Sequence, residues 1–260
     1  FLFGDSVYEV TDSIEDKPLF IEEHLQRLFR SASKIDMPIG LSSKDIEQEV
    51  LKVLKALNAK RAYIRIIVTR GISEVTLDPT SATSNNLIII TKTIKENPSW
   101  WYHKGVDVIV AKTKRTASNS VDPAIKSGNY LNNIMAYNEA VKLGAFDAIM
   151  LNHADLVTEG TTSNLWIVKD RVIITPTLKA GLLEGITRAK VLEIAAKNKL
   201  SFKEENITKE ELEGADEVFL TSSTKRIIPV VKVNTRKISN SLPGPITTKL
   251  ISLYTQLINK

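Results

Sequence analysis

The sequence predicts an α+β protein with two domains. In both halves of the chain, segments with helical spacing of apolar residues alternate with short runs rich in β-branched residues. The 260 residues exceed the length of one typical domain. Residues 113–122 (TKRTASNSVD) lack apolar periodicity and end at an Asp-Pro pair. We therefore expect a small N-terminal α/β domain over residues 1–115, a linker over 116–122 and a larger domain over 123–260.

The first domain begins with two predicted helices. One covers residues 25–35 and ends before Pro38, and the other covers 46–57, with Ser42 or Ser43 available as N-cap. Strands are predicted at 63–69, 87–93 and 106–112. Residues 72–86 are polar and rich in turn formers, which predicts a mobile loop. The chain begins at Phe1 and not at Met, and we expect a first strand upstream of it.

The second domain contains three predicted helices among several strands. The helices cover residues 129–143, 187–198 and 247–258, and Gly144 ends the first of them at its C′ position. The strands are expected near residues 146–152, 164–168, 172–175, 217–221 and 228–233.

The composition excludes several classes of protein. Because the chain has no cysteine, it forms no disulfide, thiolate zinc site or cysteine nucleophile. The 35 Lys and Arg residues against 30 acidic ones give a net charge of +5 that is dispersed, so we expect no nucleic-acid partner. No apolar run approaches the ~20 residues of a membrane helix, and no signal-peptide pattern is present. We expect a cytoplasmic protein without a membrane partner.

Common catalytic motifs are also absent. The sequence has no G-x-S-x-G elbow, and its three histidines have no obvious catalytic partners. It has neither the His spacing of a zinc helix nor the glycine patterns of nucleotide-binding loops, so no metal site is predicted. Lys, Glu, Arg, Thr and Ser remain as reactive residues. This inventory suits a lysine that forms an imine with an aldehyde cofactor.

Seven motifs occur in order along nearly the whole chain. They are FGDSVYE (3–9), EHLQRL (23–28), YIR (63–65), AIKSGNYLNNIMAY (124–137), TEGTTSNLWIV (158–168), ITPTLKAGLLEGITRAK (174–190) and EVFLTSSTKRIIPVV (217–231). Together they resemble the class IV, or fold-type IV, pyridoxal-phosphate-dependent aminotransferases. That family includes branched-chain aminotransferases, D-amino acid aminotransferases and aminodeoxychorismate lyases. The resemblance implies a β-barrel-like α/β C-terminal domain, a homodimer, and pyridoxal 5'-phosphate bound between the domains.

The resemblance assigns the two central groups of the reaction. Lys126 precedes the Asn-Tyr-Leu helix and is expected to form the Schiff base with the cofactor, then to move a proton at the substrate Cα. Glu159 is expected to keep the pyridine nitrogen protonated so that the ring can act as an electron sink. Read alone, Lys126 would be a surface side chain and Glu159 an exposed turn residue.

The same resemblance predicts the remaining cofactor contacts. The phosphate is expected to bind the start of a helix, two serines and one guanidinium, namely Gly185, Ile186, Thr187, Ser222, Ser223 and Arg27. Tyr130 is expected to bind the ring oxygen, Leu183 to pack on the ring, and Thr162 to line the site. Thr187 can equally be a helix cap, Arg27 a surface residue and Leu183 a core residue.

Substrate choice depends on a few side chains, which are Tyr8, Tyr63, Arg65 and Thr224. Tyr8 and its surrounding motif look like the D-amino acid enzymes, but the Arg-x-His carboxylate trap of those enzymes is absent after residues 69–71. Tyr63 and Arg65 match positions that branched-chain enzymes use around the substrate. Lys225 and Arg226 place two cations in a turn, where a dianionic substrate or only water could meet them.

These observations favour a pyridoxal-phosphate-dependent transaminase acting through Lys126 on small amino acids and 2-oxo acids. The preferred substrates are L-branched-chain amino acids, with 2-oxoglutarate and glutamate as the second pair. A D-amino acid aminotransferase and a 4-amino-4-deoxychorismate lyase are alternatives on the same fold. A non-catalytic binding protein is the alternative from another class.

Overall fold

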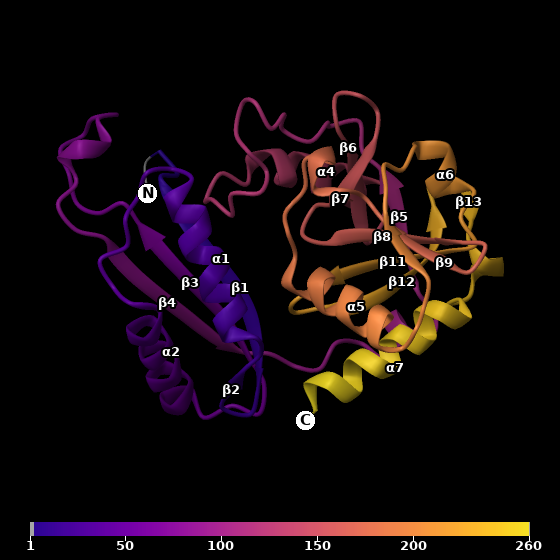
Figure 1. Ribbon diagram of the computed structural model, residues 1–260, viewed down its shortest axis with the longest axis horizontal. Coiled ribbons are helices and arrows are strands. Elements are labelled where there is room, and N and C mark those ends of the chain that lie inside the picture. The colour runs from indigo at the N-terminus through magenta and orange to yellow at the C-terminus, as the bar shows by residue number, and fades with distance from the viewer. Residues whose placement is uncertain (1–2, 260) are drawn as a thin grey trace. The chain divides into compact units, whose positions relative to one another are not determined.

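Contacts within the chain divide it into two units (Figure 1). The structure is a computed structural model that describes residues 3–259. Unit 1 comprises the chain up to Glu96 together with Ile125–Asn129, and unit 2 comprises Asn97–Ala124 and the chain from Tyr130 onward. The strand expected upstream of Phe1 lies outside the described residues.

This division differs from the boundary expected at residues 116–122. Strand β5 (Val106–Val110) pairs with two strands of unit 2, so the change of unit precedes it. Ser127 forms a β-bridge with Val7, which returns residues 125–129 to unit 1. A short polar segment therefore belongs to unit 1 although both of its flanks belong to unit 2.

Unit 1 is a four-stranded antiparallel sheet with the order β2-β1-β3-β4. Its elements are β1 (Ser6–Ile14), β2 (Lys17–Pro18), α1 (Ile21–Ser33), α2 (Ser43–Leu57), β3 (Ala62–Thr69), a 3-10 turn at Pro79–Ser81 and β4 (Asn86–Thr93). The two helices share one apolar core with the sheet, to which Leu28, Val50 and Ile66 belong. The two predicted helices are present, and Ser42 caps α2 in a capping box with Asp45.

Strand β1 is not predicted from the sequence. Four of its polar residues (Glu9, Thr11, Asp12 and Ser13) are buried. The carboxylates of Glu9 and Asp12 form ion pairs with arginines elsewhere in unit 1. A strand that buries polar groups on both faces lacks the alternation of apolar and polar residues on which strand prediction depends.

Unit 2 contains a closed barrel of six strands, as the family resemblance implies. The barrel strands are β5, β6 (Asp147–Leu151), β7 (Val157–Gly160), β8 (Asn164–Lys169), β11 (Glu217–Ser222) and β12 (Arg226–Val233). They follow the order β8-β11-β12-β5-β6-β7, and the pair formed by Glu159 and Asn164 closes the ring between β7 and β8. Strands β9 (Val172–Thr175), β10 (Phe202–Glu204) and β13 (Arg236–Lys237) extend the sheet beyond the barrel.

Three long helices of unit 2 agree with the prediction. They are α4 (Leu131–Lys142), α5 (Ile186–Lys197) and α7 (Pro245–Ile258), and Gly144 follows α4 with a φ of 67° that favours glycine. The short helices α3 (Trp100–His103) and α6 (Lys209–Glu213) and the 3-10 turns Leu178–Ala180 and Ser239–Ser241 are not predicted. Segments of this length are too short to show a period.

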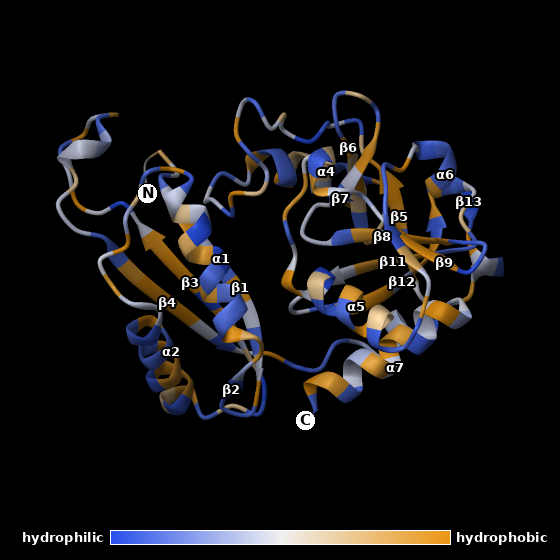
Figure 2. Ribbon diagram, viewed as in Figure 1, coloured by the Kyte–Doolittle hydropathy of each residue, from blue (hydrophilic) through white to orange (hydrophobic). Residues whose placement is uncertain are grey.

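The strands of both sheets are predominantly apolar and the loops polar (Figure 2). In unit 2 the rings of Trp166 and Phe219 stack with centroids 5.4 Å apart, and both side chains are fully buried. Over residues 3–259, no helix has both the length and the apolar character needed to cross a membrane.

Candidate active site

Lys126 lies in the segment of unit 1 that runs beside β1. Its backbone N–H donates to Ser31 Oγ in α1 over 3.2 Å, and its carbonyl accepts the N–H of Tyr8 over 2.9 Å. The neighbouring Ser127 bridges to Val7 in the same strand. The backbone of Lys126 is therefore held by both a helix and a strand, so its side chain extends from a fixed position.

Two cationic side chains lie over the ring of Tyr8. The Lys126 Nζ atom is 4.6 Å from the ring centroid, and the Arg65 Cζ atom is 4.0 Å from it. The register pairs Val10 with Arg65 and alternates side chains along each strand, so Tyr8, Tyr63 and Arg65 occupy one face of the sheet. Three predicted site residues, Lys126, Tyr8 and Arg65, are thus brought together within unit 1.

Arg27 belongs to a buried charge cluster on the opposite face of β1. Its Nε and Nη2 atoms each donate to the Glu9 carboxylate over 2.7 Å, and His24 Nδ1 lies 2.7 Å from Glu9 Oε2. All three residues are buried. Arg27 is therefore not a surface residue, and the carboxylate of Glu9 fixes the orientation of its guanidinium.

The cluster sets the ionisation of its own members. Burial acts to raise the pKa of Glu9, but the charge and hydrogen bonds of Arg27, together with His24, outweigh it and hold that pKa well below its ordinary value. Burial lowers the pKa of His24 against the opposing effect of the Glu9 carboxylate, and the charges of Arg27 and Lys126 lower it further. At pH 7 the His24 ring is neutral, and its Nδ1–H donates to Glu9.

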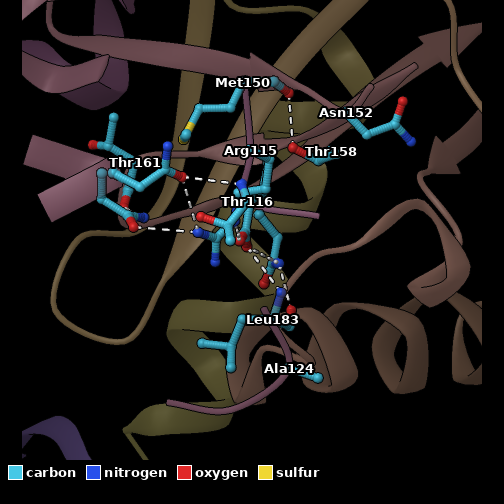
Figure 3. A network of polar contacts seen from close by, with 12 residues as sticks. Arg115, Thr116, Ala124, Met150, Asn152, Thr158, Thr161 and Leu183 are labelled. Carbon is cyan, nitrogen blue, oxygen red and sulfur yellow. Dashed lines mark hydrogen bonds and ion pairs between the residues drawn. The ribbon is translucent and has the colours of Figure 1, made fainter. Parts of the chain in front are cut away.

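Glu159 takes part in a polar network of unit 2, and Figure 3 labels two of its partners, Arg115 and Leu183. Its Oε1 atom accepts from Arg115 Nε over 3.0 Å, and its Oε2 atom accepts the backbone N–H of Leu183 over 3.1 Å. Asn164 Nδ2 is 3.4 Å from the same Oε2 atom. Arg115 Nη1 in turn lies 3.3 Å from Asn133 Oδ1 on α4. The carboxylate therefore has a fixed direction and a largely buried cationic partner.

Sequence reasoning missed Arg115, because residues 113–122 show no apolar periodicity and Arg115 directly precedes the predicted linker over 116–122. In the structure this segment runs along α4 and β6. The carboxylate of Glu139 accepts the N–H groups of Lys112 and Thr113, and the N–H of Arg115 donates to the carbonyl of Leu151 over 2.8 Å. In the sequence, Arg115 stands out only as an arginine flanked by cationic and polar residues. Such a pattern does not identify a functional residue.

Asn164 links Glu159 to the start of α5. Its Nδ2 atom donates to the carbonyl of Leu183 over 2.8 Å. A Cβ atom on Gly185 would lie 1.9 Å from the Asn164 side-chain oxygen, so any larger residue here would have to displace the Asn164 amide. Gly185 is the N-cap of α5 and supplies no capping side chain. The first amides of α5, including those of Ile186 and Thr187, form the kind of helix start that binds anions.

A buried hydroxyl completes this region. The register pairs Asn164 with Thr221, which brings the end of β11 beside the start of α5. Within the part of the chain that the structure describes, the buried Oγ atom of Ser222 has no hydrogen-bond partner. Unit 2 thus holds a carboxylate at one end of the segment 183–187 and an uncapped helix start with an unpartnered hydroxyl at the other. This donor set fits the pyridine nitrogen and the phosphate of pyridoxal phosphate.

The other predicted residues of unit 2 lie on nearby turns. Thr162 is exposed in the turn between β7 and β8, and that turn is fixed because Asp147 accepts hydrogen bonds from Thr161 and Ser163. Ser223 and Thr224 lie in the turn between β11 and β12, and Tyr130 is the N-cap residue of α4. Asp147 was not predicted from the sequence.

Comparison with known proteins agrees with this fold and donor set. Residues 6–233 match the family model described as amino-transferase class IV. The chain therefore belongs to the class IV aminotransferases, and the resemblance seen in its motifs is confirmed. Class IV aminotransferases use pyridoxal phosphate, so the chain is a pyridoxal-phosphate-dependent aminotransferase.

Individual relatives carry different substrate names. A Methanocaldococcus jannaschii protein, provisionally named a branched-chain-amino-acid aminotransferase, is 33% identical over 100% of this chain and 89% of its own. A D-alanine aminotransferase of Bacillus licheniformis is 35% identical over 95% of this chain and 85% of its own. The solved branched-chain aminotransferase of Thermoproteus uzoniensis, with norvaline, is 29% identical with a TM-score of 0.92, covering 99% of this chain and 86% of that one.

Proposed function

We propose that this enzyme transfers the amino group of L-branched-chain amino acids to 2-oxoglutarate, giving L-glutamate and the branched-chain 2-oxo acid, with Lys126 as the catalytic lysine. The observation that carries the proposal is the position of Arg65, whose guanidinium lies over the ring of Tyr8, the same ring that the Lys126 ammonium group contacts. A guanidinium there offers a partner for the second carboxylate of glutamate. Val10 and Ile67 lie on the same face of the sheet as Arg65, and their aliphatic side chains suit a branched substrate side chain. The Thermoproteus uzoniensis relative was solved with norvaline, whose aliphatic side chain is consistent with such a substrate.

A second observation favours L-amino acids over D-amino acids. Between residues 71 and 86 the chain has no arginine and no histidine, so this loop cannot supply a cationic trap for the carboxylate of a D-amino acid. D-Alanine transamination is the second candidate, supported by Tyr8 and by the 35% identity to the Bacillus licheniformis enzyme.

The residues of unit 1 would bind substrate and move its proton. Bound pyridoxal phosphate supplies an aldehyde that takes up the amino group and a ring that stabilises negative charge at the substrate Cα. The Lys126 amine would bind the aldehyde of the cofactor and would also move the proton at the substrate Cα. Tyr8 and Arg65 orient the substrate. The Glu9 carboxylate keeps the Arg27 guanidinium in place as a phosphate partner.

The residues of unit 2 would hold the two ends of the cofactor. The Glu159 carboxylate keeps a proton on the ring nitrogen, and Arg115 and the Leu183 N–H fix its direction. The amides at the start of α5 and the Ser222 hydroxyl would donate hydrogen bonds to the phosphate. Leu183 lies between these groups along the chain and would pack on the ring. We further propose that the enzyme acts as a homodimer.

The role of Lys126 is tested first by cofactor attachment. Wild-type protein mixed with pyridoxal phosphate and reduced with borohydride is expected to carry the cofactor on the peptide that contains Lys126. The variant Lys126→Ala should carry none, whereas Lys179→Ala, which removes a different lysine of the same chain, should label as wild type does. Wild-type protein that takes up no pyridoxal phosphate would sink the assignment.

Substrate class is tested by single-turnover reactions of the loaded enzyme. Each of L-leucine, L-glutamate, D-alanine and 4-amino-4-deoxychorismate is mixed with excess enzyme, and the 2-oxo acid or other product is quantified. We expect one equivalent of 2-oxo acid from L-leucine and from L-glutamate. Reaction with D-alanine alone would transfer the assignment to the D-amino acid enzymes, and release of pyruvate from 4-amino-4-deoxychorismate would identify a lyase.

A further inference from the structure

The turn between β11 and β12 carries two consecutive cations, Lys225 and Arg226. Both side chains are half-buried. Over residues 3–259, no carboxylate oxygen lies within 4.0 Å of the Lys225 ammonium nitrogen, and the contacts of that nitrogen are neutral. The buried Nε atom of Arg226 has no hydrogen-bond partner in the same part of the chain. Because no acid of the described residues pairs with Lys225, the turn carries positive charge that this part of the chain does not neutralise.

The backbone of this turn is held by the segment that begins unit 2. Asn97 Nδ2 donates to the carbonyl of Thr224 over 3.0 Å and to the hydroxyl of Tyr102 over 2.8 Å. That hydroxyl donates in turn to the carbonyl of Lys225 over 3.0 Å. Arg226, the first residue of β12, then adopts a φ of 64°, in the left-handed region. Two side chains therefore fix the position from which the Lys225 side chain extends.

The direction of the Lys225 side chain is also defined. Its Nζ atom lies 5.0 Å from the centroid of the Phe146 ring, and that ring is held edge-on by Trp101 at a centroid distance of 5.0 Å. The same Nζ atom is 3.3 Å from Thr162 Oγ1. Thr162 is exposed and lies three residues after Glu159, in the turn held by Asp147. The ammonium group is thus directed at the turn that follows the predicted catalytic carboxylate.

We propose that Lys225 binds a carboxylate group of the substrate. This inference rests on the proposed transaminase function and concerns how the enzyme binds its substrate. A fixed, unpaired ammonium group beside Thr162 and Thr224, two residues predicted to line the site, can accept a carboxylate with little loss of side-chain entropy. The carboxylate can be the one that every amino acid carries or the second one of glutamate, and the chemistry of recognition is the same.

The test measures ligand binding by calorimetry on the loaded enzyme, so it does not depend on turnover. The probes are glutarate with two carboxylates, 4-methylpentanoate with one, and 4-methylpentanamide with none. Lys225→Gln is expected to weaken carboxylate binding about tenfold, equivalent to about 1.4 kcal/mol, and to leave the amide within about threefold. Lys225→Arg should retain carboxylate binding. Lys237→Gln, which removes the same charge from the exposed strand β13, is the matched control.

The pattern of losses identifies the source of the carboxylate. A loss confined to glutarate assigns Lys225 to the second carboxylate of glutamate, and an equal loss for glutarate and 4-methylpentanoate assigns it to the carboxylate common to all amino acids. Unchanged binding of both acids would overturn the proposal. So would a loss of pyridoxal phosphate affinity alone, because Lys225 would then serve the phosphate. A wild-type enzyme that transaminates no amino acid while still binding glutarate through Lys225 would refute the proposed function and not this inference.

Discussion

Loss of the Arg115 guanidinium should destabilise the cofactor-free protein strongly, although no hydrophobic group of the core is removed. The Arg115 side chain is 11% exposed and its partner Glu159 is 6% exposed, with Nε and Oε1 3.0 Å apart. Removing one partner of a buried ion pair costs about 3–5 kcal/mol, because the remaining charge stays buried without compensation. For Arg115→Met we expect the lower end, about 3 kcal/mol, since Glu159 keeps the Leu183 N–H as a donor.

This loss should be visible as a lower melting temperature of unit 2. All three tryptophans of the chain lie in this unit, so the tryptophan fluorescence of the cofactor-free protein reports its unfolding. At roughly 2–4 °C per kcal/mol for a unit of this size, Arg115→Met should melt about 6–12 °C below wild type. Arg171→Met, which removes an exposed arginine of the same unit, should melt within about 2 °C of wild type.

A double variant separates the ion pair from simple loss of packing. Arg115→Met combined with Glu159→Gln removes both charges, so no carboxylate remains buried without its cation. We expect the double variant to regain about half of the stability lost in Arg115→Met. If Arg115→Met melts at the same temperature as the Arg171→Met control, the ion pair does not hold Glu159. The same conclusion follows if the stability lost in the double variant equals the sum of the losses in the two single variants.

Three further changes test other parts of the two units. Gly185→Ala would force the new Cβ atom against the Asn164 side chain at the start of α5. We expect the affinity for pyridoxal phosphate to fall at least about tenfold while the circular dichroism spectrum stays unchanged. An affinity equal to that of wild type would show that the start of α5 is not the phosphate site. Glu9→Gln leaves the Arg27 guanidinium buried without its carboxylate, and the free energy of unfolding in urea should fall by about 3 kcal/mol; an unchanged midpoint would contradict the burial argument. The lowered pKa of His24 means that the folded state stays neutral while the unfolded chain takes up a proton below about pH 6.5, so stability should decline as the pH falls through that value, by at most about 1.4 kcal/mol per pH unit. This slope should be smaller in His24→Gln, and equal slopes in the two proteins would show that His24 titrates normally.

Periodicity in the sequence predicts most of the elements of this fold. The helices α1 and α2 each bury a stripe of apolar residues, and that stripe is visible in the residue spacing. Helix α4 instead buries Asn133, Ala136 and Ala140 and leaves larger apolar side chains such as Leu131 and Ile134 exposed. Strand β1 shows no such apolar pattern, because its buried positions include Glu9 and Asp12. Their partners Arg27 and Arg61 lie 18 and 49 residues away, and pairing over such separations leaves no local pattern.

The residues of the candidate site also fall into two groups, those that the sequence motifs indicate and those that they do not. Lys126 and Glu159 are predicted as reacting groups because whole motifs around them resemble a known family, and neither residue would stand out by itself. Asp147 and Asn164 act by holding turns and neighbouring backbone, a role that any polar residue of the chain could have had. The sequence names the groups that would react, while the residues that orient them become visible only when hydrogen-bond partners are known.

The segment that carries Arg115 shows why absence of periodicity is a poor sign of a linker. Residues 112–116 bury few apolar groups, yet their backbone is fixed by Glu139, by Asn132 and by the carbonyl of Leu151. Such a segment is ordered by satisfying its polar groups, and it can therefore carry a guanidinium to a buried carboxylate without contributing to the core. An active site that needs a fixed charge beside a cofactor is better served by this arrangement than by an apolar strand, because the charge is compensated at the position where it is used. It follows that polar segments next to a family motif are the first place to look for residues that position the catalytic groups.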